Sequence, residues 1–417
     1  MSRANSLTER PLWLDAAAIG LLMTATLKIM ANATISPALP ALEASFSDDP
    51  GAAYLTRFLV SAPSLSVVLV APFAGMVADR IGRARLLLAG VLLFVVSGSA
   101  GAYLPDLFSI LASRLLLGVA VAMVMTAQVA LVGDMFTGAQ RSAFMGWQTA
   151  AINFSGFLYI GFAGYLAGLS PRLPFFVYAL PVVLLPFLVL ILRNEKRPAA
   201  SAGRPSELPG GTAVGRWFLP AALTGLLTMV TVMLFFLMPS QLPFYLDRNG
   251  FDAASATAIG LGALTLTGGV VAFTFRRISE RLGLAVTFGL GFLLMGCGFA
   301  ALSGAALWAL ILAGAALVGA GYALVQPGFL MLALQVAPPA RRGSVAGVVT
   351  TAMFLGQVIS PLALTPVIQG FGFAAVYLGA AAALCMLAVA SVVFALFRHR
   401  GRTDRNNDTR QALPADL

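Results

Sequence analysis

Long apolar runs follow one another along almost the whole chain, and short polar connections separate them. A helix needs about 20 mostly apolar residues to cross the hydrocarbon core of a bilayer, and these runs are long enough to do so. We count twelve of them, at residues 13–37, 53–77, 86–104, 107–133, 142–168, 173–193, 216–246, 253–275, 284–303, 305–335, 343–368 and 373–397. The pattern predicts an all-α membrane protein with 12 transmembrane helices.

Basic residues are distributed unevenly between the two sides of this predicted topology. Of the 26 Lys and Arg residues, 21 fall in the terminal segments and in the connections on the same side as the termini. The connections on the other side hold only Arg172 and Arg248, and Lys28, Arg57 and Arg114 lie within spans. Cytoplasmic loops of membrane proteins carry the excess of Lys and Arg. We therefore predict a multi-pass protein of the cell inner membrane with both termini in the cytoplasm.

The two halves of the chain repeat one another at an offset of 201 residues. Asp79-Arg-Ile-Gly82 matches Glu280-Arg-Leu-Gly283, and Arg141-Ser-Ala-Phe-Met-Gly146 matches Arg342-Gly-Ser-Val-Ala-Gly347. Gly118 matches Gly319 at the same offset. Such duplication is common in transporters. The predicted units are an N-terminal six-helix bundle (1–193), a Pro- and Gly-rich cytoplasmic linker (194–215), a C-terminal six-helix bundle (216–397) and a disordered cytoplasmic tail (398–417).

Composition excludes several classes of protein. With 59% hydrophobic and 10% charged residues and a mean hydropathy of +0.91, most of the chain must have lipid as its solvent. The net charge of +10 is spread over short loops and the ends, so no nucleic-acid site is expected. No phosphate-binding glycine loop is followed by Lys-Ser/Thr, which argues against ATP as the energy source. No cluster has metal-ligand spacing and no nucleophile has an evident base, so we expect no enzyme activity, no metal and no cofactor.

Three basic residues within the spans are the costliest features of the sequence. A charge at the bilayer centre costs at least about 2.5–3.5 kcal/mol, so each should face protein or a wet cavity. Lys28 lies near the middle of its span, with Asn32 one turn further along the same face. We predict a functional role for Lys28 and Arg114. The alternative for Arg114 is structural pairing with backbone carbonyls, and for Arg57 it is snorkelling to the interface.

Other polar and aromatic side chains in the spans complete a candidate substrate cavity for an amphiphilic small molecule. Each of the polar ones could instead bond two helices together. No Asp or Glu lies near the middle of any span, so an anionic or zwitterionic substrate fits better than a lipophilic cation. The proton-carrier candidates are Asp15, Asp79 and Asp134, each of which could equally be a solvated loop-end acid. The predicted cavity residues are Lys28, Asn32, Arg114, Gln128, Asn153, Met233, Phe236, Gln241, Tyr245, Tyr322, Gln326, Phe354 and Gln357.

The stretch from Gly75 to Arg85 packs four charges and two glycines between two apolar runs. By itself it is either a positively charged loop that sets topology or a conformational latch. Gly75 would let two helices approach closely, and Gly82 suits a helix end that needs a positive φ.

This stretch resembles the loop signature of the major facilitator superfamily, with Gly75, Asp79, Arg80, Gly82 and Arg83 in place. The next basic residue is displaced to Arg85, because Ala84 stands where a second basic residue is usual. Three further elements are similar to that family: the first resembles its signature between spans 4 and 5, and the other two resemble its 12-span drug:proton antiporters. They are Asp134 with Arg141 and Gly146, Arg114 with Gly118, and the stretch Gln241-Leu-Pro-Phe-Tyr245-Leu. One feature departs: the glycine-rich fifth span has no proline after Ala143.

The resemblance implies two pseudo-symmetric six-helix bundles around a central cavity, lined mainly by spans 1, 4, 7 and 10. It also implies alternating access by rocking of the halves. Asp79 would lie at the start of span 11, near Arg342–Ser344, where a helix N-terminus favours a carboxylate by roughly 0.3–1 kcal/mol. The predicted latch residues are Gly75, Asp79, Arg80, Gly82, Arg83, Asp134 and Arg141.

These observations favour a secondary active transporter that exports a small organic molecule, such as a drug or metabolite, against protons. An alternative is an organic-anion carrier, working by uptake or exchange, that uses the positive charges of Lys28 and Arg114. A third possibility is a receptor or scaffold on the same fold, against which the lack of a sizeable soluble domain argues. We expect the partners to be the substrate, protons and the lipid bilayer, and the protein to act as a monomer.

Overall fold

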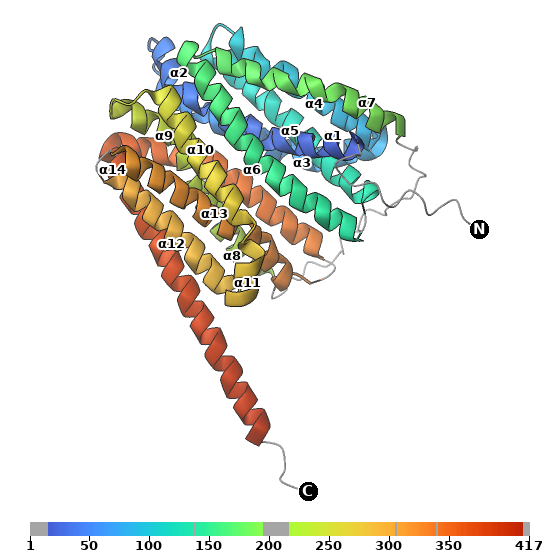
Figure 1. Cartoon of the computed structure of the whole chain (residues 1–417), viewed down its shortest axis with the longest axis vertical. Helices are drawn as coiled ribbons and strands as arrows, with labels where there is room; N and C mark the ends of the chain where they lie inside the picture. The colour runs from blue at the N-terminus through green and yellow to red at the C-terminus, as the bar shows by residue number, and fades with distance from the viewer. Residues whose placement is uncertain (1–15, 137, 195–216, 305–306, 339–340, 412–417) are drawn as a thin grey trace, which may run out of the picture.

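The computed structural model of the chain describes residues 16–136, 138–194, 217–304, 307–338 and 341–411 (Figure 1). These residues form helices and no β-strand, as predicted for an all-α protein. Up to residue 194 the elements are α1 (Ala16–Ala33), η2 (Ser36–Ala38), α2 (Leu39–Ser45), α3 (Ala52–Ile81), α4 (Arg83–Ser99), η3 (Ala100–Ala102), α5 (Leu107–Met135), α6 (Gly138–Leu169), η4 (Leu173–Leu184) and α7 (Leu185–Asn194). From residue 217 they are α8 (Phe218–Phe235), α9 (Leu237–Arg248), α10 (Ala253–Ala272), α11 (Phe275–Leu282), α12 (Leu284–Ser303), α13 (Trp308–Val336) and α14 (Arg342–Gln411).

Among the described residues, ten helical segments are long and apolar enough to cross a membrane. Two departures from the twelve predicted spans explain the difference. The predicted span 173–193 corresponds to a shorter apolar helix, Leu173–Val189. The last two predicted spans both lie in α14, where Gly372 (φ 81°, ψ 167°) leaves the helical conformation.

The C-terminal end of the chain differs from the prediction. We expected disorder from residue 398, but α14 continues through Gln411 and projects beyond the other helices (Figure 1). No proline occurs between residue 398 and Pro414, so nothing in this polar stretch removes a backbone donor and stops the helix. The predicted linker at 194–215 lies outside the described residues except for Asn194.

Local chemistry accounts for several helix ends. The Asp106 carboxylate accepts a hydrogen bond from the backbone N–H of Ser109 at 2.8 Å and caps α5, which lowers the pKa of that carboxyl. Gly82 has φ of 97°, so the predicted positive φ at the turn between α3 and α4 is confirmed. Helix α8 ends at Phe235 because Pro239, four residues on, has no N–H to donate to it.

Helices of each half pack mainly against one another. In the first half α5 contacts α3 and α4, and α1 contacts α6; in the second half α12 contacts α13 and α14, and α10 contacts α13. Two extensive contacts join the halves, α6 with α10 and α3 with α14. Figure 1 shows α6 and α10 side by side along this junction. The space between the halves is therefore bordered by two helix pairs.

Close glycine contacts repeat in the two halves. A Cβ on Gly118 would lie 2.1 Å from the Pro63 carbonyl oxygen, and one on Gly319 would lie 2.0 Å from that of Leu264. Both members of the second pair lie 201 residues after those of the first, which is the offset of the sequence repeat. Small residues let helix backbones approach closely in membranes. The repeat therefore describes matching α3–α5 and α10–α13 packings as well as matching loops.

Candidate functional site

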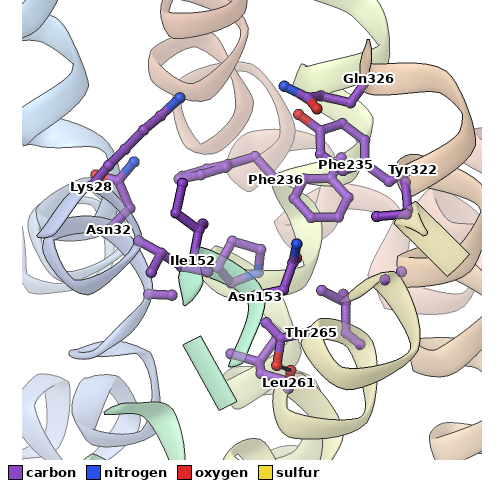
Figure 2. Close-up of a pocket in the computed structure, with 18 of the residues that line it drawn as sticks. Lys28, Asn32, Ile152, Asn153, Phe235, Phe236, Leu261, Thr265, Tyr322 and Gln326 are labelled. Atoms are coloured by element: carbon purple, nitrogen blue, oxygen red, sulfur yellow. Dashed lines mark hydrogen bonds between the residues drawn. The ribbon is translucent and has the colours of Figure 1, made fainter. Parts of the chain in front are cut away.

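A cavity of about 360 Å³ lies between the two halves, and side chains from α1, α6, α8, α9, α10, α13 and α14 line it (Figure 2). Of the predicted cavity residues, seven line it: Lys28, Asn32, Asn153, Phe236, Tyr322, Gln326 and Gln357. Side chains of the expected spans 1, 7 and 10 (α1, α8–α9 and α13) line the cavity, but no described residue of span 4 (α5) does. Helices α6, α10 and α14 also contribute, because α6 and α10 meet along the junction of the halves.

Lys28 is the one charged residue among the described residues that line this cavity. Its ammonium nitrogen lies 5.3 Å from the centroid of the Phe354 ring, within range of a cation–π interaction. In Figure 2 the side chain is extended, and its nitrogen points away from Asn153 and Thr265. No Asp or Glu lines the cavity within the described part of the chain. The cavity thus has a positive electrostatic character.

Polar side chains near Lys28 join the halves. Asn32 of α1 donates to Gln357 Oε1 of α14 at 2.9 Å, and Ser64 of α3 donates to the same oxygen at 2.5 Å. Gln357 therefore bonds two helices of the first half, and it also faces the cavity. Asn32 and Gln357 therefore link α1 to α14 in the cavity wall, and their amide groups also face a ligand in the cavity.

An aromatic pair forms the opposite wall. The rings of Phe235 and Tyr322 stack with centroids 3.8 Å apart and planes 14° from parallel. Phe235 ends α8 and Tyr322 belongs to α13, so the pair also fixes these helices relative to each other. Phe235, Thr149 and Thr265 line the cavity but were not among the predicted cavity residues. Their polar or aromatic character was visible in the sequence, but the rotation of their helices was not.

Arg114 does not line the cavity. It is fully buried, and its Nη2 donates to the carbonyl of Ala31 while its Nε donates to the carbonyl of Leu59 at 3.2 Å. The guanidinium carbon also lies 4.8 Å from the centroid of the Tyr178 ring. These contacts join α5 to α1, α3 and η4. Arg114 therefore has the geometry expected of the structural alternative, in which it pairs with backbone carbonyls.

Arg57 and Glu43 form a second polar site that the sequence analysis did not assign. Arg57 Nη1 lies 2.5 Å from Glu43 Oε2, and its Nε donates to Gln241 Oε1 at 3.3 Å. Its guanidinium carbon lies 3.6 Å from the centroid of the Phe244 ring. Gln241 Nε2 in turn donates to Thr365 at 2.9 Å. We call these five residues the far-end clamp, because they join the two halves at the end opposite the α3–α4 turn.

The signal for the clamp was present in the sequence as an acid 14 residues before an in-span arginine. The short helix α2, which carries Glu43, brings the two together. Gln241 and Tyr245, both predicted cavity residues, lie at this end. Tyr245 is buried against the rings of Phe373 and Tyr377.

Two further predicted cavity residues lie outside the lining. Gln128 is buried and donates to Gln148 at 3.3 Å, which links α5 to α6. Met233 is partly buried and packs against the hydrophobic core.

In this conformation no hydrogen bond or ion pair joins the side chain of a described latch residue to the second half. Asp79 is exposed, and its carboxylate has no hydrogen bond or ion pair to another described residue. Arg83 forms an exposed ion pair with Asp134 instead. The expected close helix contact at Gly75 is absent here, since no neighbouring atom lies within 4 Å of its Cβ position. Asp15 and the side chain of Arg141 lie outside what the structure describes.

A second cavity, of about 420 Å³, lies between α3, α5 and α14, and Phe354 is one of its lining residues. Three threonines, Thr126, Thr350 and Thr351, are the only polar side chains among the described residues that line it. Its apolar lining residues are Val67, Val68, Ala71, Pro72, Ala122, Met125, Val129 and Phe354, with Gly347 completing the wall.

Solved transporter structures share this fold. A mutant of the nucleoside transporter NupG superposes with a TM-score of 0.71 at 13% sequence identity, over 90% of this chain and 99% of that one. A mutant of the peptide transporter POT superposes with a TM-score of 0.69 at 15% identity, over 93% of this chain and 98% of that one.

Sequence relatives match over shorter stretches. Multidrug resistance protein 2 of Bacillus subtilis (strain 168) is 36% identical over 119 residues, which is 28% of this chain and 30% of the relative. Quinolone resistance protein NorA of Staphylococcus aureus (strain MRSA252) is 30% identical over 150 residues, or 36% and 39%. The matched stretch thus spans less than half the length of these relatives.

One family model covers nearly the whole chain. The model described as Major Facilitator Superfamily matches residues 21–361 and, in a second match, residues 255–416. The all-helical fold, the apolar helices and the solved neighbours agree with that match. This chain is a multi-pass membrane protein and belongs to the Major Facilitator Superfamily.

Proposed function

We propose that this protein is a secondary active transporter that exports a small organic molecule by alternating access, driven by protons. The observation that carries the proposal is the cavity between the halves, which is walled by both, while the far-end clamp joins the halves at the end opposite the α3–α4 turn. If the halves rock against each other, a binding site in this cavity is exposed first to one side of the membrane and then to the other.

The arrangement in the membrane is part of the proposal. Twelve spans form two six-helix bundles, residues 1–193 and 216–397, joined by the linker 194–215. The repeated glycine contacts at an offset of 201 residues support this division. The excess of Lys and Arg supports a cytoplasmic position for the α3–α4 turn. The conformation is then inward-facing, with the far-end clamp closing the outer side.

Export is supported by two relatives whose names are a multidrug resistance protein and a quinolone resistance protein. A proton carrier is not assigned. Asp79 and Asp134 are exposed at the end of α3 and α5, away from the cavity lining. We propose that Asp79 and Asp134 couple proton movement to transport by changing the conformation. Asp15, the third candidate, lies outside the described residues.

A flux measurement tests the proposal. Purified protein is reconstituted into liposomes, a proton gradient is imposed, and movement of a panel of fluorescent organic solutes is followed. We expect solute to accumulate on the acidic side and the accumulation to stop when a protonophore collapses the gradient. If no solute moves under any gradient, the proposal is wrong.

Lys28 supports a second candidate function. A cation in a cavity without a described carboxylate favours an organic-anion carrier, working by uptake or exchange. Counterflow separates the two functions: an anion carrier should exchange labelled for unlabelled anion at unchanged rate after the proton gradient is collapsed. A proton-driven exporter should lose net accumulation under the same condition.

A further inference from the structure

Phe354 of α14 lies between two cavities of opposite character, because it lines one of them and its ring lies near Lys28 of the other. On one side is the cavity of about 360 Å³, where Lys28, Asn32, Asn153, Gln326 and Gln357 offer polar groups. On the other side is the cavity of about 420 Å³, which is lined mainly by apolar side chains of α3 and α5. Phe354 itself is only 2% exposed, so a ligand that occupies both cavities must displace its ring.

Lys28 lies at this boundary. Its ammonium group is 5.3 Å from the Phe354 ring centroid and has no ion pair with any described residue. No described acid lines either cavity. A cation held within the span of a membrane protein costs free energy that an anionic ligand group would offset. The aromatic ring offsets only part of that cost.

We propose that the two cavities together bind one acidic amphiphile, with its anionic head at Lys28 and its hydrocarbon tail beyond Phe354, between α3, α5 and α14. This inference rests on the proposed transport function, because it names the substrate class of the same central site. The first cavity supplies amide groups for the head. The second cavity supplies apolar side chains that cover the tail and remove its surface from water. A cationic amphiphile of the same length would meet Lys28 with like charge.

We call the second cavity, of about 420 Å³, the tail cavity. Its apolar lining predicts how binding affinity depends on the length of the hydrocarbon chain. Burying one methylene group favours binding about fourfold, so affinity should rise with chain length until the cavity is filled. The test uses full-length protein in nanodiscs of zwitterionic lipid, with radiolabelled hexanoate, octanoate, decanoate and dodecanoate and with subtraction of empty nanodiscs. We expect a rise of at least about tenfold from hexanoate to dodecanoate. Decyltrimethylammonium should displace labelled decanoate poorly, at least about tenfold less effectively than unlabelled decanoate.

Two variants separate head from tail. Thr350→Phe adds a ring to the tail cavity from an exposed position of α14 and should flatten the chain-length dependence. Val270→Phe is the matched control, because Val270 is 62% exposed on α10 and lines neither cavity. Lys28→Met should remove the preference for decanoate over decanol, and Lys28→Arg should keep it.

The outcomes are distinct. An unchanged chain-length dependence in Thr350→Phe, or equal displacement by the alkylammonium, overturns the amphiphile proposal even if other solutes are transported. Binding as expected, without flux of any solute, supports the two-lobed site and contradicts the proposed transport function instead. Thermal unfolding of each variant shows whether a loss of binding comes from a loss of the fold.

Discussion

At the residue scale, Lys28 and Arg114 carry the same charge in contacting helices but lie in different environments. Lys28 faces a cavity and lies within cation–π range of the Phe354 ring. Arg114 is fully buried and donates to the carbonyls of Ala31 and Leu59. The two residues should therefore respond differently to the same kind of substitution.

Replacing Lys28 with Met should raise the thermal stability of the protein and weaken binding of organic anions at least about tenfold, because it removes a costly unpaired cation that would pair with an anion. Arg114→Met should have a different effect. It should cost about 1.5–3 kcal/mol of stability through lost charged hydrogen bonds and should leave the anion affinity of the folded fraction unchanged. Thermal unfolding and equilibrium binding on the same preparations measure both effects. Equal effects of the two variants on affinity would contradict this assignment.

Arg57→Met should loosen the far end. The variant loses the ion pair with Glu43, the bond to Gln241 and the contact with the Phe244 ring. A hydrogen bond to a charged group is worth about 1.5–3 kcal/mol, so the outward-open population should rise about tenfold or more. Labelling of a single cysteine at position 153, in a background without Cys297 and Cys385, from the outer side reports the change.

Arg172→Met is the control for this experiment. Arg172 lies at the same end, donates to the Leu104 carbonyl and stacks near the Phe46 ring, but all these residues belong to the first half. It should not change the labelling. If both variants raise labelling equally, the far-end clamp has no special role in holding the halves together.

At the element scale, pairs of helices are held at very short separation by glycine. Gly118 of α5 faces the backbone of Pro63 in α3, and Gly319 of α13 faces that of Leu264 in α10. In both places the obstacle to a larger side chain is a backbone carbonyl, which has no rotamer to change. The two helix pairs therefore form rigid units within their halves.

Gly118→Ala and Gly319→Ala should each destabilise the protein by about 1–3 kcal/mol or more, because the added methyl group would force the helices apart. Gly161→Ala on α6 is the matched control, since no atom lies within 4 Å of its Cβ position. That change should be neutral or stabilise by up to about 1 kcal/mol, as alanine favours the helix. Thermal unfolding in one detergent compares the three, and similar shifts in all of them would contradict the close packing.

At the scale of the whole molecule, the hydrogen bonds between the halves gather away from the α3–α4 turn. Within the described residues they include Asn32 and Ser64 with Gln357, and Tyr54 with Gln369. Near the turn, Gly75, Gly343 and Gly347 have open space at their Cβ positions. The halves therefore contact at one end and separate at the other.

Asp79→Asn tests the proposed latch at this scale. In the state closed at the α3–α4 end, Asp79 is expected to meet the start of α14, where a helix N-terminus favours a carboxylate by roughly 0.3–1 kcal/mol. The variant should shift the population toward the present conformation and slow transport. The readouts are flux and labelling of a cysteine at position 350 from the cytoplasmic side. Unchanged flux and labelling would leave Gly75–Arg85 as a topology-setting loop only.

The sequence by itself determined the helical membrane fold, the repeat and the family. These depend on the length of apolar runs, on the charges between them and on Gly82, whose φ is positive as predicted. It also identified Lys28, Asn32 and Tyr322 as cavity residues, because a polar group within a span must face protein or water.

Only the tertiary structure decided which in-span polar groups face the cavity. Arg114 and Gln241 had the same sequence signal as Lys28, but the rotation of their helices directs them elsewhere. Arg114 donates to backbone carbonyls, and Gln241 accepts a hydrogen bond from Arg57. The pairing of Arg57 with Glu43, and the position of Phe354 between two cavities, depend on how α2, α3 and α14 meet. Hydropathy specifies that a helix crosses the membrane, but packing against its neighbours sets its rotation.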